Sequence, residues 1–496
     1  MPLTIHINPK DNVVVALHPV AKGTPVEVKD LGITVTAAED IPQGHKMCIT
    51  PLKTGDNIIK YGFAIGHATA DAAAGSWMHT HNIKTNLSGE VEYSYAPNLH
   101  PLAPVAPETF PGYRRKDGRA AIRNEIWIIP TVGCVNDCAK VLVRDNQDLV
   151  TGSIDGLHCF THPFGCSQTG ADHAQTRKLL AALCRHPNAG AVLVLSLGCE
   201  NLTHEQFLAE LGDYDHDRIK FLICQEVDDE LIAGREVLRE LAGYAAQFQR
   251  EPIPASDLVI GMKCGGSDGL SGITANPTIG RFSDMLCARG GSTVLTEVPE
   301  MFGAEGFLMN RCQNDEVFEK AVAMINGFKN YFISHHEVVY DNPSPGNKQG
   351  GITTLEDKSC GCVQKGGSAP IMDVIGYGDP VTTKGLNMLY GPGNDLVSAT
   401  ALTAAGAHMV LFSTGRGTPF GAPAPTLKIA TNSQLAAKKS TWIDFNAGVI
   451  ADGEKTIDET AQELYKLVLA VAGGKQTKAE EKGFREISIF KDGVTL

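Results

Sequence analysis

The sequence has no long hydrophobic run and no excess of positive charge. No uninterrupted apolar stretch reaches the length of a membrane-spanning helix, and Met1–His6 shows no basic segment followed by an apolar core, as a secretory signal would. The formal net charge of -13 argues against nucleic acid as the main partner. We therefore expect a cytoplasmic protein with no membrane and no nucleic-acid partner, in which local lysine and arginine residues can still bind an anionic substrate.

Familiar cofactor and zinc motifs are also absent. None of the glycine-rich loops matches a dinucleotide-binding fingerprint or a P-loop, and no pair of CxxC motifs suggests structural zinc. The 13 cysteines are therefore interpreted as thiols or ligands rather than as a disulfide framework. Five of them adjoin a glycine in loop-like settings: Cys134, Cys166, Cys199, Cys264 and Cys362. Such residues are either small buried side chains or parts of a soft-metal or redox-sensitive site.

The stretch 263–277, KCGGSDGLSGITANP, is too rich in glycine for the interior of a helix or strand and too polar for a mere linker. It follows the apolar run 258–262, which predicts a buried strand. The loop is therefore expected at the carboxyl end of a strand, where open α/β sheets bind ligands. Its backbone amides and polar side chains suit an anionic, oxygen-rich ligand. The alternative is a tight turn that caps a helix starting near Pro277.

Residues 1–97 contain short β-like runs separated by turns and predict a compact all-β module. Its distinctive segment is GSWMHTHN at 75–82. On a strand, His79 and His81 would point to the same face and could bind one metal ion or one substrate. Two partly exposed histidines on a β surface are the alternative. Residues 98–111 are rich in proline and predict a stiff linker that lets the module lie over the site as a lid.

The rest of the chain alternates strand-like and helical stretches, which predicts parallel βαβ units in two parts, 112–250 and 251–496. Two polar loops, 343–362 and 391–395, show no helix or strand pattern, and long loops of this kind are more often functional than idle. Arg416 lies between two glycines, which suits bidentate binding of a carboxylate.

Several long motifs occur together along the chain. They are SWMHTHN at 76–82, RN at 123–124, FGCSQ at 164–168, LGCEN at 197–201, CGGSDGLSGITAN at 264–276, LTEVPEMFGAE at 295–305, NPSPGNK at 342–348 and FSTGRGTP at 412–419. Together they resemble the altronate/galactarate dehydratase family, from the N-terminus to the closing residues 490–496. The resemblance implies an α/β protein with an N-terminal SAF-type β-clip module followed by two Rossmann-like α/β domains. These agree with the divisions 1–97, 98–111 (the linker), 112–250 and 251–496. Cys138 and Cys360 depart from the family pattern and are left out of the expected site.

The activity that the resemblance implies is iron-dependent elimination of water from a sugar acid to give a 2-keto-3-deoxy acid. The expected substrate is D-altronate and the product 2-keto-3-deoxy-D-gluconate, as part of hexuronate catabolism in a homo-oligomer, such as a dimer. Galactarate dehydration and elimination of sulfite from sulfolactate are alternatives on the same core. A carbohydrate-binding protein without activity is the alternative from another class.

This chemistry removes a weakly acidic proton from C2 and expels hydroxide from C3, so it needs charge stabilisation and a general acid. We expect Fe(2+), replaceable by Mn(2+), with an iron–sulfur cluster as the alternative if three cysteines converge. The expected catalytic residues are His79, His81, Lys348, Glu356 and Lys358. The expected substrate-binding residues are Arg123, Asn124, Gly265, Gly266, Ser267, Asp268, Asn276, Asn347, Asn394 and Arg416. The expected metal ligands are His79 and His81, with Cys134, Cys166, Cys199, Cys264 and Cys362 as alternatives.

Overall fold

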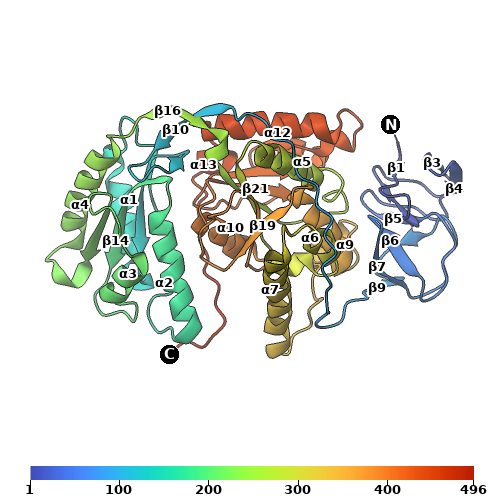
Figure 1. Ribbon diagram of the computed structural model, residues 1–496, viewed down its shortest axis with the longest axis horizontal. Coiled ribbons are helices and arrows are strands. Elements are labelled where there is room, and N and C mark those ends of the chain that lie inside the picture. The colour runs from blue at the N-terminus through green and yellow to red at the C-terminus, as the bar shows by residue number, and fades with distance from the viewer. Residues whose placement is uncertain (1) are drawn as a thin grey trace.

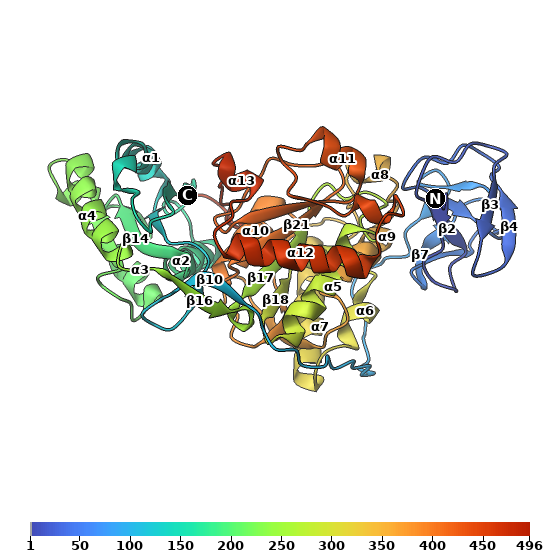
Figure 2. The ribbon, with the colours of Figure 1, turned by 90° about the horizontal axis from the view of Figure 1, so that it is seen from above.

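The computed structural model describes residues 2–496 and arranges the chain in three parts (Figure 1). A strand-only N-terminal region lies at one end, a large α/β part in the middle and a smaller α/β part at the other end. The view turned by 90° shows the same order (Figure 2). The fold class expected from the sequence is confirmed. No helix in residues 2–496 is both long enough and apolar enough to cross a membrane.

The N-terminal region consists of three small antiparallel sheets with the strand orders β1-β2-β5-β8, β3-β4 and β6-β7-β9. Its strands are β1 Thr4–Ile5, β2 Val13–Ala16, β3 Pro25–Val28, β4 Ile33–Thr36, β5 Lys46–Cys48, β6 Asn57–Lys60, β7 Phe63–Ala68, β8 Trp77–Met78 and β9 Ile83–Lys84. Strand β3 alternates exposed and buried residues, as expected for a strand with one face on a core. Val14, Val26, Val35 and Met47 meet in that core.

The histidine pair does not lie on a strand, which corrects the sequence-based prediction. Strand β8 ends at Met78, and His79 and His81 lie in the turn that follows. The turn forms because the Asn82 side chain accepts a hydrogen bond from the His79 N–H at 2.8 Å, while the Asn82 N–H donates to the His79 carbonyl. The two side chains therefore do not share the face of a pleated strand.

The proline-rich segment is packed along the protein and ends earlier than predicted. Residues 85–108 form no helix or strand, and several of their tyrosine and leucine side chains pack against the central core. Strand β10 begins at Thr109, inside the predicted linker 98–111, and pairs with β16. These strands and their neighbour are β10 Thr109–Arg114, β11 Ala120–Ala121 and β16 Arg250–Pro254. The strand accommodates Pro111 because β11 pairs only with its last two residues, which leaves one edge unpaired at the proline.

The smaller α/β part contains a four-stranded parallel sheet with the order β13-β12-β14-β15. Its elements are β12 Glu125–Pro130, α1 Asn136–Asp145, β13 Gly156–Cys159, α2 Gly170–Arg185, β14 Ala189–Ser196, α3 His204–Leu211, β15 Ile219–Ile223 and α4 Glu230–Ala245. Strands β12 and β14 are buried along their whole length, as expected for parallel strands covered by helices on both faces.

The central part contains a seven-stranded parallel sheet with the order β19-β20-β18-β17-β21-β22-β23. Its strands are β17 Val259–Cys264, β18 Ser292–Leu295, β19 Ile371–Ile375, β20 Gly385–Leu389, β21 Met409–Thr414, β22 Thr426–Ala430 and β23 Phe445–Asn446. Its helices are α5 Ala275–Ala288, α6 Glu305–Met309, α7 Asp315–Ser334, α8 Pro345–Gln349, α9 Leu355–Cys362, α10 Asp395–Ala404, α11 Ser433–Lys438, α12 Ile457–Ala472 and α13 Lys478–Glu481. Strands β18, β19 and β20, which follow β17 in the chain, lie on one side of it, and β21 lies on the other side. The carboxyl ends of β17 and β21 therefore form a topological switch point, where open α/β sheets bind ligands.

The polar loop 343–362 contains two short helices, α8 and α9, which the sequence pattern did not predict. Ser344 and Thr354 cap their N-termini through side-chain hydrogen bonds to the backbone. The pattern failed for α9 because every residue of that helix is buried, so it has no polar face and no helical periodicity of apolar residues.

Candidate active site

A cavity of about 1010 Å³ opens at the carboxyl edge of the central sheet, beside the switch point. Its polar wall contains Cys264, Glu300, Asp341, Asn342, Ser344, Asn347, Lys348, Lys358, Asn394 and Asp395, and its apolar wall contains Phe328, Tyr331, Phe332, Val339 and Phe490. The size and the mixture of charged and amide groups suit a small polar anion better than a hydrophobic ligand.

The glycine-rich loop brings the backbone to the floor of this cavity. Strand β17 ends at Cys264, and the Gly265 N–H donates to the Ser413 carbonyl of β21 at 3.0 Å. A Cβ atom at Gly265 would lie 2.6 Å from the Asp395 carboxylate oxygens, so only glycine allows this approach. Gly266 has a φ of 63°, in the left-handed region that favours glycine. The two glycines thus let β17, β21 and α10 meet at one point.

Three buried lysines pair with three carboxylates behind and along the cavity wall. Lys263 Nζ lies 2.6 Å from Asp395 Oδ1 and 3.1 Å from Glu297 Oε1. Lys358 Nζ lies 2.7 Å from Glu300 Oε1, and Lys365 Nζ lies 3.2 Å from Glu297 Oε2. The lysine side chains are at most 8% exposed. Isolated buried charges are costly, so the balanced pairing is what allows them to stay ionised here.

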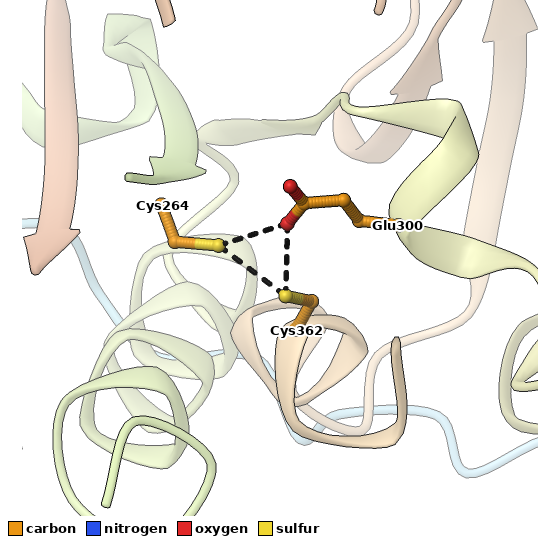
Figure 3. A group of neighbouring side chains, drawn as sticks. All are labelled: Cys264, Glu300 and Cys362. Atoms are coloured by element: carbon orange, nitrogen blue, oxygen red, sulfur yellow. Dashed lines mark hydrogen bonds between the residues drawn. The ribbon is translucent and has the colours of Figure 1, made fainter. Parts of the chain in front are cut away.

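Two thiols and a carboxylate form a compact group (Figure 3), and two of its members, Cys264 and Glu300, line the cavity. Cys264 Sγ, Cys362 Sγ and Glu300 Oε2 come from the end of β17, the end of α9 and the turn after β18. The two sulfur atoms are 3.3 Å apart and lie 3.2 and 3.0 Å from Glu300 Oε2. Lys365 Nζ lies 3.0 Å from Cys264 Sγ. Within residues 2–496, this is the only group of three His, Cys, Asp or Glu ligand atoms that all lie within 4.8 Å of one another.

The charges of this group follow from burial and from the lysines. Burial alone would raise the pKa of Glu300, but Lys358 and Lys365 outweigh it and lower the pKa to about 2. Burial raises the pKa of Glu297 above its usual value despite Lys263 and Lys365. The hydrogen bond to Cys264, together with burial, raises the pKa of the Cys362 thiol well above its usual value. Glu300 is therefore ionised at neutral pH.

Seven residues predicted from the sequence line the cavity: Cys264, Gly265, Gly266, Asn347, Lys348, Lys358 and Asn394. Cys362 joins them through Cys264 and Glu300. The amide of Asn347 is engaged by the protein, because Nδ2 donates to the Ser267 carbonyl at 2.8 Å and Oδ1 accepts from Ser344.

Four predicted residues lie behind or beside the cavity rather than on its wall. Asp268 is half-buried and accepts hydrogen bonds from Thr431 and Asn432, and Ser267 precedes it in the same loop. Asn276 donates to the Gly361 carbonyl and accepts from Ser413, so it joins α5, α9 and β21. Arg416 is exposed and donates to Gln349 Oε1 at 2.9 Å.

The remaining predicted residues lie elsewhere. Arg123 pairs with Glu480 at 2.8 Å, and the Asn124 side chain donates to the Ser153 and Ala245 carbonyls, within and beside the smaller α/β part. Glu356 accepts hydrogen bonds from the Thr85 hydroxyl and the Asn86 N–H, and so anchors the start of the proline-rich segment. His79 and His81 do not line the cavity. Cys134, Cys166 and Cys199 lie at the carboxyl edge of the smaller sheet.

Sequence reasoning missed five charged residues of the site: Lys263, Glu297, Glu300, Lys365 and Asp395. The three carboxylates could have been found from the sequence, because Glu297 and Glu300 follow the end of β18 and Asp395 follows the end of β20. The glycine-rich loop 263–277 was identified because it follows β17 in the same way. The two lysines carried no such signal. Lys263 lies inside a strand, and Lys365 lies in a short turn after α9.

The N-terminal region flanks the cavity instead of covering it, which differs from the predicted lid. None of the residues that line the cavity precedes Cys264. Lys46 and Lys60 reach the buried Asp357 of α9 at 2.7 and 2.9 Å, and the Ile65 carbonyl accepts a hydrogen bond from Thr354. These buried contacts hold the region against α9.

Known families and proteins match this chain along its whole length. The altronate/galactarate dehydratase SAF domain matches residues 2–86, the second domain of D-galactarate dehydratase/altronate hydrolase matches 112–246, and the C-terminal D-galactarate/altronate dehydratase domain matches 255–495. The chain is 53% identical to an altronate dehydratase of Escherichia coli (strain K12) and 51% identical to one of Bacillus subtilis (strain 168), in each case over 99% of both chains. It is 33% identical to the galactarate dehydratase (L-threo-forming) of Escherichia coli (strain K12), over 91% of this chain and 90% of that one. The chain therefore belongs to the altronate/galactarate dehydratase family.

Proposed function

We propose that the protein is a hydro-lyase that removes water from D-altronate to give 2-keto-3-deoxy-D-gluconate. The identity to two altronate dehydratases, 53% and 51%, supports this substrate over galactarate, for which the identity is 33%. The structural observation that carries the proposal is the polar cavity at the switch point, with its buried lysine–carboxylate pairs. A sugar acid brings one carboxylate and several hydroxyls, which match this lining.

The cavity contains cations for the substrate carboxylate and for the charge that develops in the reaction. Lys348 is half-buried on the wall, and Lys358 is nearly buried beside Glu300. Burial alone would lower the pKa of Lys358, but Glu300 outweighs it and raises the pKa well above its usual value. Lys358 therefore stays protonated, so it can bind the carboxylate and stabilise an enediolate but cannot accept the C2 proton.

Two carboxylates on the wall, Glu300 and Asp395, are available for proton transfer. Each is paired with a buried lysine, at 2.7 and 2.6 Å. Glu300, with its pKa of about 2, is ionised at neutral pH. A positioned carboxylate of this kind contributes on the order of 100- to 10,000-fold to a proton transfer. We assign the C2 proton to one of these two groups. Asp395→Asn tests Asp395 directly, and Glu300→Gln, which also changes a candidate iron ligand, is compared with the wild type at equal bound iron.

Fe(2+) is the cofactor expected from the family resemblance, and Cys264, Glu300 and Cys362 are a donor set that fits it. Their ligand atoms lie within 4.8 Å of one another, and thiolate and carboxylate are both ligands of first-row metals. Bound iron would supply Lewis-acid stabilisation of the enediolate charge. The thiolates are softer ligands than the His79 and His81 pair considered from the sequence, so replacement by Mn(2+) is expected to be less effective at this set.

A substrate panel tests the proposal. The protein is supplied with Fe(2+) under anaerobic, reducing conditions, and D-altronate, galactarate and sulfolactate are compared by direct detection of the keto-acid product. We expect D-altronate to give the highest kcat/KM. Turnover of galactarate with inert D-altronate would refute the substrate, and binding without turnover of any sugar acid would favour the carbohydrate-binding alternative.

The cytoplasmic location and the homodimer expected from the sequence remain part of the proposal. Sedimentation of the purified protein tests the dimer directly, and a monomer at the concentration of the activity assay would remove that part.

A further inference from the structure

The smaller α/β part has a switch point of its own. The chain runs from β12 to β13 on one side and returns to β14 on the other side, so the carboxyl ends of β12 and β14 border a crevice of the kind that binds ligands. The loops that follow β12, β13 and β14 carry Cys134, Cys166 and Cys199. All three thiols are exposed and free. None of them lines the main cavity, so the function proposed above leaves them without a role.

The three cysteine loops are joined into one layer. Their cross-links are Gly133 N–H to the Phe164 carbonyl at 2.9 Å, Leu202 N–H to the Gly165 carbonyl at 3.0 Å, and Ser167 N–H to Asn201 Oδ1 at 2.8 Å. Because the loops leave three neighbouring strands at the same edge and bond to one another, they hold one exposed thiol each in a single layer at this edge.

The layer is supported from below by buried polar groups. The Glu200 carboxylate is 6% exposed and accepts hydrogen bonds from the Thr131 hydroxyl at 2.7 Å and from the Gly198 N–H at 2.6 Å. Gly165 has a φ of 94°, and a Cβ atom there would lie 1.8 Å from the Thr131 carbonyl oxygen. These contacts bind the loops after β13 and β14 to the end of β12, so the thiols are presented on a rigid support.

A buried donor in the same layer has no partner. Gln168 is 3% exposed, and its Oε1 accepts the Gly165 N–H, but its Nε2 has no hydrogen-bond partner. Buried polar atoms are nearly always satisfied, and such a donor suits a ligand that contains acceptor atoms. Inorganic sulfide in a cluster is one such acceptor.

The spacing of the thiols distinguishes between two kinds of ligand. Around one tetrahedral ion with metal–sulfur bonds of about 2.3 Å, the sulfur atoms are about 3.8 Å apart. Within residues 2–496 only Cys264, Glu300 and Cys362 form a trio within 4.8 Å, so the other three sulfurs are spread more widely. An iron–sulfur cubane takes each thiolate on a different iron and therefore accepts wider spacing.

We propose that Cys134, Cys166 and Cys199 bind a 4Fe–4S cluster. Each thiol loses its proton and binds one iron, and the fourth iron is left without a protein thiolate. That iron is a Lewis acid at the surface, open to an oxygen ligand such as a hydroxyl or carboxylate. The proposal does not rest on the dehydratase function, because its readouts are iron, sulfide and thiol chemistry.

The test uses the full-length protein, purified anaerobically and reconstituted with ferric iron, sulfide and a thiol that reduces part of the iron. Iron, acid-labile sulfide and the visible spectrum are measured for the wild type and for Cys134→Ser, Cys166→Ser and Cys199→Ser. The matched controls are Cys138→Ser, which removes a thiol of α1 near the same edge, and Cys264→Ser in the main cavity. We expect about four sulfides per chain in the wild type and both controls, with about four irons in addition to any iron held by Cys264, Glu300 and Cys362, and broad visible absorption. Each of the three variants should lose the sulfide and the colour.

A second measurement covers the case in which a variant fails to fold. Thiols of the wild type are alkylated before and after removal of iron with a chelator and are then identified by mass spectrometry. Protection of Cys134, Cys166 and Cys199 that ends when the iron is removed is the expected result. The proposal is overturned by a wild type that takes up no sulfide, by zinc or a single iron bound without sulfide, by a cluster that survives all three substitutions or is lost with Cys264→Ser, or by thiols that are alkylated equally in both states.

Discussion

Asp357 of helix α9 joins the N-terminal region to the catalytic part through two lysines, and its replacement provides a sharp test of the fold. Lys46 Nζ and Lys60 Nζ lie 2.7 and 2.9 Å from its carboxylate, and all three side chains are at most 2% exposed. Burial alone would raise the pKa of Asp357, but the two ammonium groups outweigh it and hold the pKa well below its usual value. Asp357→Asn leaves two buried cations without a counter-charge. We expect a loss of about 3–5 kcal/mol in the free energy of unfolding, as for other broken buried ion pairs.

The same triad predicts an asymmetry. Lys46→Met leaves the balanced pair of Lys60 and Asp357, so it should cost less than Asp357→Asn although it also removes a hydrogen bond to the Gly351 carbonyl. Burial lowers the pKa of Lys46 to about 8, against the opposing effect of Asp357. The folded state thus binds fewer protons than the unfolded state between pH 8 and the unfolded value near 10.5. The free energy of unfolding of the wild type, measured relative to that of the Lys46→Met variant, should therefore rise with pH across this window, by up to about 3 kcal/mol.

The assay is denaturant and thermal unfolding, followed by tryptophan fluorescence and by circular dichroism. Trp77 reports on the N-terminal region, which the triad holds in place. The matched control is Asp71→Asn, which breaks the Lys53–Asp71 pair of the same region at 2.8 Å. These side chains are 78% and 58% exposed, so the expected cost is below about 1 kcal/mol. The reasoning is refuted if Asp357→Asn destabilises no more than Asp71→Asn, or if Lys46→Met costs more than Asp357→Asn.

Three further predictions concern the site. Glu300→Gln should lower kcat by on the order of 100-fold or more with retained secondary structure, because it removes an ionised carboxylate from the cavity wall. Near-normal turnover would mean that another group accepts the C2 proton. Lys348→Met should raise KM for D-altronate by roughly 10-fold through loss of a charge-assisted contact, with a smaller effect on kcat, and an unchanged KM would contradict its role. Burial, followed by the charge of Lys46, lowers the pKa of His79 to about 4. The pH profile of kcat should therefore show no step from this residue between about pH 5 and 8, and His79→Ala/His81→Ala should leave kcat little changed. A large loss of kcat in a folded double variant would return both histidines to the site.

The most productive rule in the sequence analysis was that open α/β sheets bind ligands in the loops after the carboxyl ends of their strands. The glycine loop after β17 was placed correctly at the carboxyl edge of a parallel sheet, because a buried apolar run followed by glycines has few other structural solutions. The same rule, applied to the segment after β18, would have identified Glu297 and Glu300. The side-chain alternation of a strand, which was the basis for pairing His79 and His81, did not apply because a local asparagine turn replaced the expected strand.

The sequence by itself determined the order of the parts, the strand-only N-terminal region, the two parallel sheets and the family, because these depend on local periodicity and on motifs that are contiguous in the chain. Only the tertiary structure decided which of the five glycine-adjacent cysteines meet. Cys264 and Cys362 lie 98 positions apart and yet their sulfur atoms are 3.3 Å from each other, while Cys134, Cys166 and Cys199 gather at the edge of a different sheet. The reason is that strand order places loops from distant parts of the chain at one edge of a sheet. The charges of buried groups such as Glu300 and Lys358 likewise depend on partners that no local pattern specifies.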